Sequence, residues 1–89
     1  MKAIVTVVGK DQVGIIAAVC IKLAEYNVNV LDISQTVMQG YFTMMMVVDV
    51  SGCTLPLAEL CAAMEEMGKG KNLSVRVQRE DIFEAMHRI

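Results

Sequence analysis

The spacing of hydrophobic and polar residues changes along the 89-residue chain, and each spacing predicts a different element. Residues 2–8 are almost uniformly apolar and β-branched, which is typical of a strand buried on both faces. Residues 30–38 alternate between apolar and polar side chains and predict a half-buried strand. Residues 41–50 predict a third strand, joined to the second by a tight turn at Gln39-Gly40. A fourth, alternating strand is predicted over 73–79.

Two further stretches carry apolar residues at the period of an α-helix. The first runs from about 14 to 26 and follows a loop of glycines and polar residues at Gly9–Gly14. The second is expected to have Thr54 as its N-cap and Pro56 in its first turn, and to end just before Gly68. The apolar stripes are Ile15, Ile16, Val19, Cys20 and Leu23 in the first helix, and Leu57, Leu60, Cys61, Met64 and Met67 in the second.

The predicted order β-α-β-β-α-β corresponds to a ferredoxin-like α+β sandwich. Right-handed crossovers place both helices on one face of a four-stranded antiparallel sheet. We expect one domain over residues 1–79, and a short C-terminal helix over 80–89 as a helical extension of that domain, with acidic residues at its start and basic residues at its end. The other sheet face, where Met45 is expected, stays open unless a partner or the last helix covers it.

Composition bears on partners and location. Hydrophobic residues make up 55% of the chain, yet no apolar run approaches the ~20 residues of a membrane-spanning helix. This favours a homodimer or higher homo-oligomer over a membrane protein. The net charge is −2 and the basic residues are scattered, which argues against nucleic-acid binding. The N-terminus has no signal-peptide pattern, so we expect a cytoplasmic protein.

The reactive side chains do not form a catalytic or metal-binding pattern. Cys20, Cys53 and Cys61 are odd in number and lack CxxC spacing, so we expect reduced thiols, no metal site and no cofactor. The only histidine, His87, is expected at a solvated helix end. We therefore predict no catalytic residues and no enzymatic activity. An acylphosphatase-like enzyme is the weaker alternative, because Lys10 is the only cation in the loop where that chemistry needs an arginine.

The loop between the first strand and first helix has the pattern Gly9-x-Asp11-x-x-Gly14-Ile15-Ile16, and Asn29 follows just before the second strand. Backbone N–H groups at a helix N-terminus suit a carboxylate, and Gly14 allows close approach. Asp11 or the Asn29 side-chain carbonyl can accept hydrogen bonds from an ammonium group. Structural alternatives remain open: Asp11 as a helix N-cap, Gly14 as a packing residue, and Asn29 and Gly9 as turn residues.

These features resemble the ACT domain family over about residues 2–79, and within it the UPF0237 group and the ACT domains of glycine-cleavage regulators. The segment 79–83 adds to that closer resemblance. The resemblance implies a regulatory protein that binds an amino acid between the first loop of one subunit and the helix–strand junction of a neighbour, and that modulates a protein partner. The alternative is a dimerisation or protein-interaction module without a ligand. The implied ligand-binding positions are Asp11, Gln12, Val13, Gly14, Ile15 and Asn29.

Overall fold

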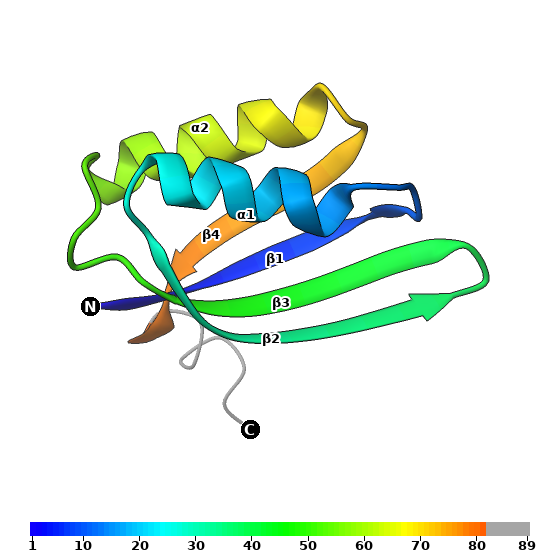
Figure 1. Cartoon of the computed structure of the whole chain (residues 1–89), viewed down its shortest axis with the longest axis horizontal. Coiled ribbons are helices and arrows are strands. Elements are labelled where there is room, and N and C mark those ends of the chain that lie inside the picture. The colour runs from blue at the N-terminus through cyan, green and yellow to red at the C-terminus, as the bar shows by residue number, and fades with distance from the viewer. Residues whose placement is uncertain (82–89) are drawn as a thin grey trace.

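Residues 1–81 are described by a computed structural model, which contains one four-stranded antiparallel sheet with the strand order β2-β3-β1-β4. Both helices lie on the same face of this sheet (Figure 1), as the sequence predicted. The fold is therefore the ferredoxin-like α+β sandwich. Its elements are β1 (Lys2–Lys10), α1 (Ile15–Glu25), β2 (Asn29–Met38), β3 (Tyr41–Asp49), α2 (Leu57–Lys69) and β4 (Leu73–Arg79).

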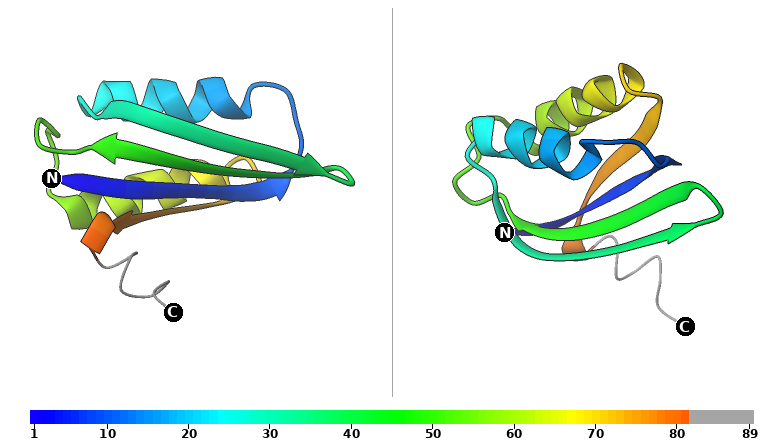
Figure 2. Two further views of the ribbon diagram at one scale, coloured as in Figure 1. Left: turned by 90° about the horizontal axis from the view of Figure 1, so that it is seen from below. Right: turned by 45° about the vertical axis from the view of Figure 1, so that its right-hand side comes forward.

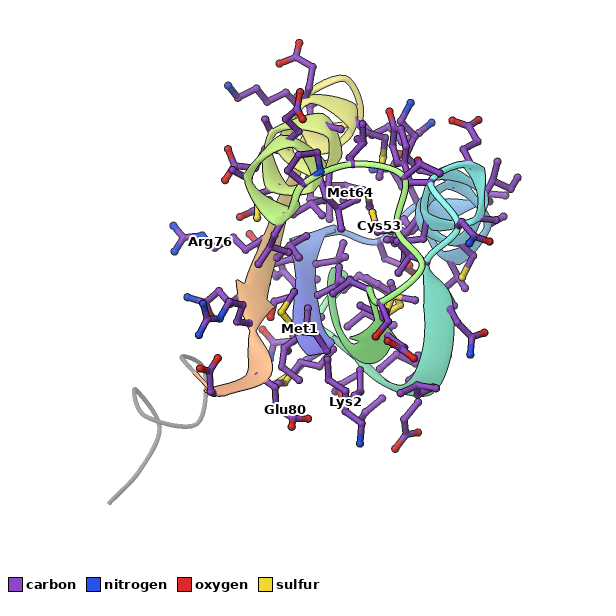
Figure 3. All side chains as sticks on the ribbon, turned by 90° about the vertical axis from the view of Figure 1, so that its left-hand side faces the viewer. Met1, Lys2, Cys53, Met64, Arg76 and Glu80 are labelled. Atoms are coloured by element: carbon purple, nitrogen blue, oxygen red, sulfur yellow. The ribbon has the colours of Figure 1, made fainter. Side chains whose placement is uncertain are left out.

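The hydrophobic core fills the space between the helices and the sheet. Figure 2 shows the resulting two layers, and in Figure 3 Met64 of α2 points from the helix layer toward the strands. Phe42, Met44, Met46 and Val48 of β3 are buried beneath the helices, and Met45 lies on the other face of the sheet, as expected. The largest fully buried side chains are Leu23, Met44, Met46, Leu60, Met64, Val5, Val7, Val19 and Val48.

The strand β2 is less buried than its alternating sequence predicted. Leu31, Ile33 and Val37 are 40–55% exposed, and within β2 only Val30 is partly buried. The reason is position: β2 is an edge strand, so it has a neighbouring strand on one side only. A register shift between Val30 and Asp32 also places Leu31 in a bulge, so it does not share the face of Ile33 and Val37.

The ends of α2 differ from the expected ones. Thr54 does not cap the helix; Pro56 is the N-cap residue, with an extended backbone and no side-chain capping bond. Gly68 lies inside the helix rather than beyond it. A Cβ at Gly68 would lie 2.7 Å from Val75 Cγ2 and 2.8 Å from the Leu73 carbonyl oxygen. This glycine therefore permits close contact between α2 and β4, and the helix continues past it to Lys69.

The predicted C-terminal helix over 80–89 lies mostly outside the described residues. Glu80 and Asp81 form a helical turn directly after β4, and 82–89 are not described. The division into a domain over 1–79 and an extension over 80–89 stays a prediction.

Candidate functional site

The N-terminus of α1 is shaped by Gly14. This residue has φ 87° and ψ 9°, in the left-handed region that favours glycine, and α1 has no side-chain capping bond. The interpretation of Asp11 as an N-cap is therefore wrong. The first N–H groups of α1, which begin at Ile15, have no acceptors within the helix and point out of its end. This end can receive an anion such as a carboxylate.

The loop before α1 is fixed at both sides by hydrogen bonds. The Asp11 backbone N–H donates to the Gly40 carbonyl over 2.8 Å, and Gln12 Nε2 donates to the Lys71 carbonyl over 3.0 Å. The Asp11 and Val13 side chains are exposed. The loop thus has a fixed backbone and presents a carboxylate, an apolar side chain and the end of α1 to solvent.

The structural roles of Gly9 and Gly14 differ from those that the sequence suggested. No atom lies within 4 Å of a Cβ placed on Gly14, so helix–strand packing does not explain this residue, whereas its positive φ does. Gly9 lies within β1 rather than in a turn. A Cβ there would lie 2.5 Å from Leu73 Cδ2 and 3.2 Å from the Asn72 carbonyl oxygen, so Gly9 permits close packing against the start of β4.

Asn29 is the first residue of β2, at the opposite end of the sheet from the loop. The turn after α1 is made by Asn27 instead, which has φ 59° and donates from Nδ2 to the Gly52 carbonyl over 2.9 Å. Asn29 pairs with Asp49, and Asp49 pairs with Lys2, whereas Asp11 follows Lys10 at the other end of β1. Eight strand steps of ~3.3 Å separate these ends by about 26 Å. One chain brings Asp11, Gln12, Val13, Gly14 and Ile15 together, but not Asn29.

An open strand edge connects these two ends. Gln39 and Gly40, with φ 51° and 82°, form a two-residue hairpin turn, in which the flanking pair Met38 and Tyr41 exchange hydrogen bonds. Along an antiparallel pair of strands, hydrogen-bonded and non-hydrogen-bonded residue pairs alternate. Because Met38 is hydrogen-bonded to Tyr41, the N–H and C=O groups of Ile33, Gln35 and Val37 point away from β3. The Ile33 N–H accordingly donates to the side-chain Oδ1 of its neighbour Asp32 over 2.9 Å.

The flank of α1 above this edge carries no charge. Lys22 and Tyr26 lie on the opposite flank, where they line a hollow together with residues of α2. Ile16 lies about 120°, and Cys20 and Ala24 about 160°, around the helix from Lys22, on the β2 side. We name this uncharged flank together with Ile33, Gln35 and Val37 the β2 edge surface. The signal that would have identified it in the sequence is the absence of charge from 33 to 38.

Shifted pKa values occur away from the loop. The Ser51 backbone N–H and hydroxyl, followed by the N-terminal ammonium, lower the pKa of Asp49 beside Asn29. Burial, followed by the charge of Glu65, raises the pKa of the Cys61 thiol, whose Sγ lies 3.2 Å from the Val77 carbonyl oxygen and donates to it.

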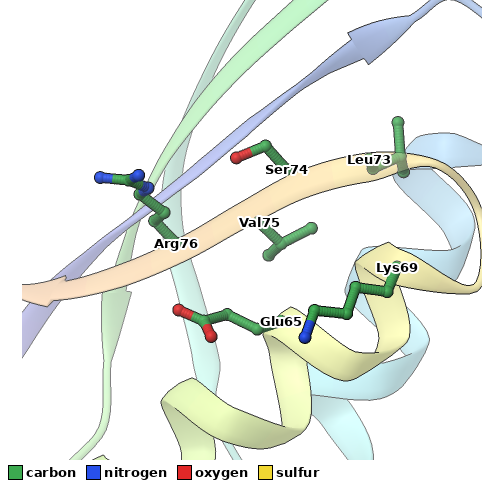
Figure 4. A pocket seen from close by; sticks show the side chains of 6 residues that line it. All are labelled: Glu65, Lys69, Leu73, Ser74, Val75 and Arg76. Atoms are coloured by element: carbon green, nitrogen blue, oxygen red, sulfur yellow. The ribbon is translucent and has the colours of Figure 1, made fainter.

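A groove of about 270 Å³ lies between α2 and β4, lined by Glu65, Lys69, Leu73, Ser74, Val75 and Arg76 (Figure 4). It contains none of the predicted site residues. Within residues 1–81 there is no group of three or more histidine, cysteine, aspartate or glutamate side chains that could hold a metal ion. The helices described in that range are also too short or too polar to cross a membrane.

Comparison with known proteins agrees with this fold. A UPF0237 protein of Listeria monocytogenes is 49% identical over 89 residues, which is the whole of both chains. A UPF0237 protein of Bifidobacterium longum is 52% identical over 88 residues, covering 99% of this chain and 98% of the other. The ACT domain protein from Streptococcus pneumoniae has a TM-score of 0.83 and 48% identity, and 98% of each chain is covered.

Two regulatory proteins contain a similar domain within longer chains. The regulatory subunit of aspartate kinase from Thermus thermophilus has a TM-score of 0.69 and 25% identity over 89% of this chain and 51% of that one. A putative glycine cleavage system transcriptional repressor has a TM-score of 0.74 at 20% identity, over 88% of this chain and 44% of that one, which shows a shared fold. The ACT domain family model matches residues 2–78. The chain therefore belongs to the ACT domain family, and its full-length relatives are UPF0237 proteins.

Proposed function

We propose that this protein is a regulatory ACT domain that binds a free amino acid between two copies of the chain. The observation that carries the proposal is the separation of the candidate residues. Asp11–Ile15 and Asn29 lie at opposite ends of the sheet, and the open edge of β2 runs between them. A second copy that pairs antiparallel along this edge brings the loop of one subunit to Asn29 of the other.

The register of this pairing follows from the side chains. Placing Gln35 on the two-fold axis pairs Ile33 with Val37 of the partner subunit on both sides of the axis, which buries apolar groups against each other. It also keeps the only charge of the strand, Asp32, away from its own copy. In this register Asn29 comes level with the 39–41 turn of the partner subunit. The Asp11 N–H of each subunit is bonded to Gly40 in that same turn.

The chemistry of the combined site fits an α-amino acid. Its carboxylate is received by the free N–H groups at the start of α1, next to Ile15 and Ile16. Its ammonium donates to the Asp11 carboxylate and to the side-chain carbonyl of Asn29 of the partner subunit. Gln12 is held by its bond to Lys71 and fixes the loop, while Val13 borders the ligand side chain.

Regulation without catalysis is part of the same proposal. A ligand that binds only between subunits stabilises one arrangement of the dimer, and a protein partner that recognises this arrangement responds to the amino acid. The likeness to the regulatory subunit of aspartate kinase supports this role. We further propose that the protein acts in the cytoplasm and has no enzymatic activity.

Thermal unfolding with a panel of the twenty amino acids at millimolar concentration tests ligand binding. We expect one or a few of them to raise the melting temperature, and the rise to disappear in Asp11→Ala and in Asn29→Ala. Lys71→Ala serves as a control, because Gln12 bonds to the backbone carbonyl of that residue. No response to any amino acid would contradict the proposal, and an unchanged response in both variants would contradict the proposed site.

The second candidate is a dimerisation module without a small ligand. Its support is that Asp11, Gln12, Val13, Gly14 and Asn29 are all exposed, and one chain does not enclose a ligand between them. This candidate predicts the same dimer but no amino-acid response. Sedimentation equilibrium together with the thermal panel separates the two candidates.

A further inference from the structure

The sheet has a second face, on the side away from α1 and α2 (Figure 2), which we name the open face. Because side chains alternate along a strand, every second residue of each strand lies on this face. The strand register arranges these residues in four transverse rows, and the first and fourth rows mark the two ends of the face. The rows are Asp32, Val47, Ile4 and Gln78; Ser34, Met45, Thr6 and Arg76; Thr36, Thr43, Val8 and Ser74; and Met38, Tyr41 and Lys10.

A hollow of about 210 Å³ lies at the first end of the open face. Ile4, Met45 and Val47 give it apolar walls, and Asp32 and Ser34 of β2 border it with a carboxylate and a hydroxyl group. We name these five residues the open-face hollow. Its lining suits a group that is apolar over most of its surface and carries one hydrogen-bond donor.

Tyr41 at the fourth end of the same face is such a group. Its side chain is 58% exposed, and it combines an aromatic ring with a hydroxyl donor. Tyr41 and Val47 lie on the same strand, six residues apart. At ~3.3 Å per residue this separation is about 20 Å, so Tyr41 does not reach the hollow of its own chain. The Tyr41 of a second copy is able to reach it.

Two-fold symmetry allows two copies to make this contact in both directions. We consider two open faces packed against each other, with the two-fold axis between them and across the strands, midway between the second and third rows. This axis brings the first row of each copy opposite the fourth row of the other. Tyr41 then lies opposite Val47 of the partner subunit, twice in each pair. Facing sheets are ~10 Å apart and their side chains interdigitate, so each ring enters a hollow.

The polar groups of the two faces are compatible in this arrangement. Asp32 stands beside Val47 in the first row, so its carboxylate can accept a hydrogen bond from the Tyr41 hydroxyl of the partner subunit. No two like charges lie opposite each other in the four rows. The other facing pairs, with the second residue in the partner subunit, are Asp32 with Met38, Lys10 with Ile4, Arg76 with Ser74, Thr6 with Val8 and Met45 with Thr43.

The position of this axis also agrees with the dimer proposed above. The axis of that dimer passes through Gln35, which lies between Ser34 and Thr36 and therefore midway between the second and third rows. The two axes are perpendicular and cross at this level. Two perpendicular two-fold axes that intersect close four copies into a D2 tetramer, without free faces that would continue into a fibre.

The area of the open face indicates a weak contact. Four rows of ~6.7 Å across four strands of ~4.8 Å cover about 500 Å² in each copy. The total of about 1,000 Å² lies at the lower limit for a specific interface. The contact also lacks the main-chain hydrogen bonds of strand pairing. It should therefore form at higher protein concentration than the pairing along β2.

We propose that the open face binds the open face of a second copy of this chain, and that each copy inserts Tyr41 into the open-face hollow of the other. This contact does not depend on amino-acid binding. Only its closure into a tetramer depends on the proposed pairing along β2.

Sedimentation velocity from micromolar to millimolar protein tests the contact. We expect dimers at low concentration and tetramers at high concentration. Tyr41→Ala should raise the dissociation constant of the second step on the order of 100-fold, because each pair of faces loses two buried rings. Ile21→Ala is the matched control, since Ile21 is similarly exposed at 61% but lies on α1. It should leave this constant unchanged.

Mixing two variants tests the reciprocal insertion. Met45→Glu places a charge in the hollow and should weaken self-association as Tyr41→Ala does. A mixed pair keeps one contact, because Tyr41 of the Met45→Glu chain enters the intact hollow of the Tyr41→Ala chain. The mixture should associate on the order of 10-fold more tightly than either variant alone. Circular dichroism checks that each variant is folded, and if one is not, the other is compared with Ile21→Ala.

Three results would overturn the proposal: a dissociation constant that Tyr41→Ala leaves unchanged, a mixture that associates no better than its components, or no association beyond the first step at millimolar protein. Association that Tyr41→Ala removes and Gln35→Pro does not would support the open-face contact and contradict the pairing along β2. The two proposals can therefore fail separately.

Discussion

The two edge strands of the sheet, β2 and β4, meet their surroundings in different ways. The strand β4 has seven residues, two of which are arginines, and α2 lies close against it through Gly68. The carbonyl of Val77 accepts the Cys61 thiol of α2. The strand β2 has ten residues and only one charge, and its Ile33 and Val37 side chains stay exposed.

This difference shows which edge is protected against strand pairing and which edge is available for it. Charged residues, short length and a covering helix are the usual means by which proteins block an edge strand, and β4 has all three. Residues 33–38 of β2 have none of these three features. The nearest charge is the Asp32 carboxylate, which accepts a hydrogen bond from the Ile33 N–H. An exposed, uncharged edge of this kind accepts another strand, and the same strand in a second copy satisfies the two-fold symmetry.

Proline scanning of β2 gives the largest expected effects. The Gln35 N–H points outward, so Gln35→Pro should keep the fold of each chain but prevent pairing at the two-fold axis. We expect the dimer dissociation constant to rise on the order of 100-fold, because two hydrogen bonds between the subunits are lost and the proline ring clashes with the partner strand. Analytical ultracentrifugation measures this change.

The neighbouring variant Thr36→Pro is the matched control. The Thr36 N–H points inward to β3, so its loss should lower the free energy of unfolding by roughly 3 kcal/mol or more. If Gln35→Pro left the dimer intact, or if it destabilised the chain as much as Thr36→Pro, the proposed open edge would be wrong.

Substitution at Gly68 tests the protected edge. The Cβ of Gly68→Ala would be forced against Val75 and the Leu73 carbonyl. We expect the free energy of unfolding to fall by about 1–2 kcal/mol, a net value that already includes the gain in helix propensity from replacing glycine with alanine. Urea denaturation measures it. Gly70→Ala is the control, because Gly70 has a helical backbone with φ −64° and its nearest neighbour is 3.6 Å away. Stabilities that rise equally in both variants would show that α2 does not pack tightly on β4.

Substitution at Gly14 tests the loop at the end of the β2 edge. Its positive φ means that Gly14→Ala should lower the free energy of unfolding by about 1 kcal/mol, and Gly40→Ala should have a similar effect in the hairpin turn. Gly14→Ala should also weaken the thermal response to the bound amino acid. A response equal to that of the unsubstituted chain would separate the start of α1 from ligand binding.

Cys61 provides the smallest effect and concerns β4. Because its thiol pKa is raised in the folded chain, the stabilisation from the neutral thiol is complete below the pKa of the unfolded chain and is lost as the pH rises through the folded value. Alkylation by iodoacetamide should therefore be slower at Cys61 than in the unfolded chain, with the difference shrinking above pH 9. Mass spectrometry follows the rate, and Cys61→Ser should keep the donor while abolishing the labelling. Rates that are equal in folded and unfolded chains would contradict a buried thiol on this edge.

Much of the fold could be predicted because its signals are local. The periods of residues 2–8, 41–50 and 73–79 identify strands, and the stripe of Val19 and Leu23 identifies a helix, without knowledge of distant contacts. Helix ends were less predictable. Gly68 reads as a helix terminator in sequence, but contact with β4 requires a glycine inside the helix. Asn27 and Asn29 likewise cannot be ranked as turn residues until the backbone of Asn27 is seen at φ 59°.

The sequence by itself determined the order of elements, the ferredoxin-like fold and the resemblance to the ACT domain family, because periodicity and short motifs depend on neighbours in the chain. Only the tertiary structure decided that Asp11 and Asn29 lie at opposite ends of the sheet and that β2 has the open edge. Both facts depend on the strand order and on which strand each helix covers. These are set by contacts between residues far apart in sequence, and local patterns do not contain them.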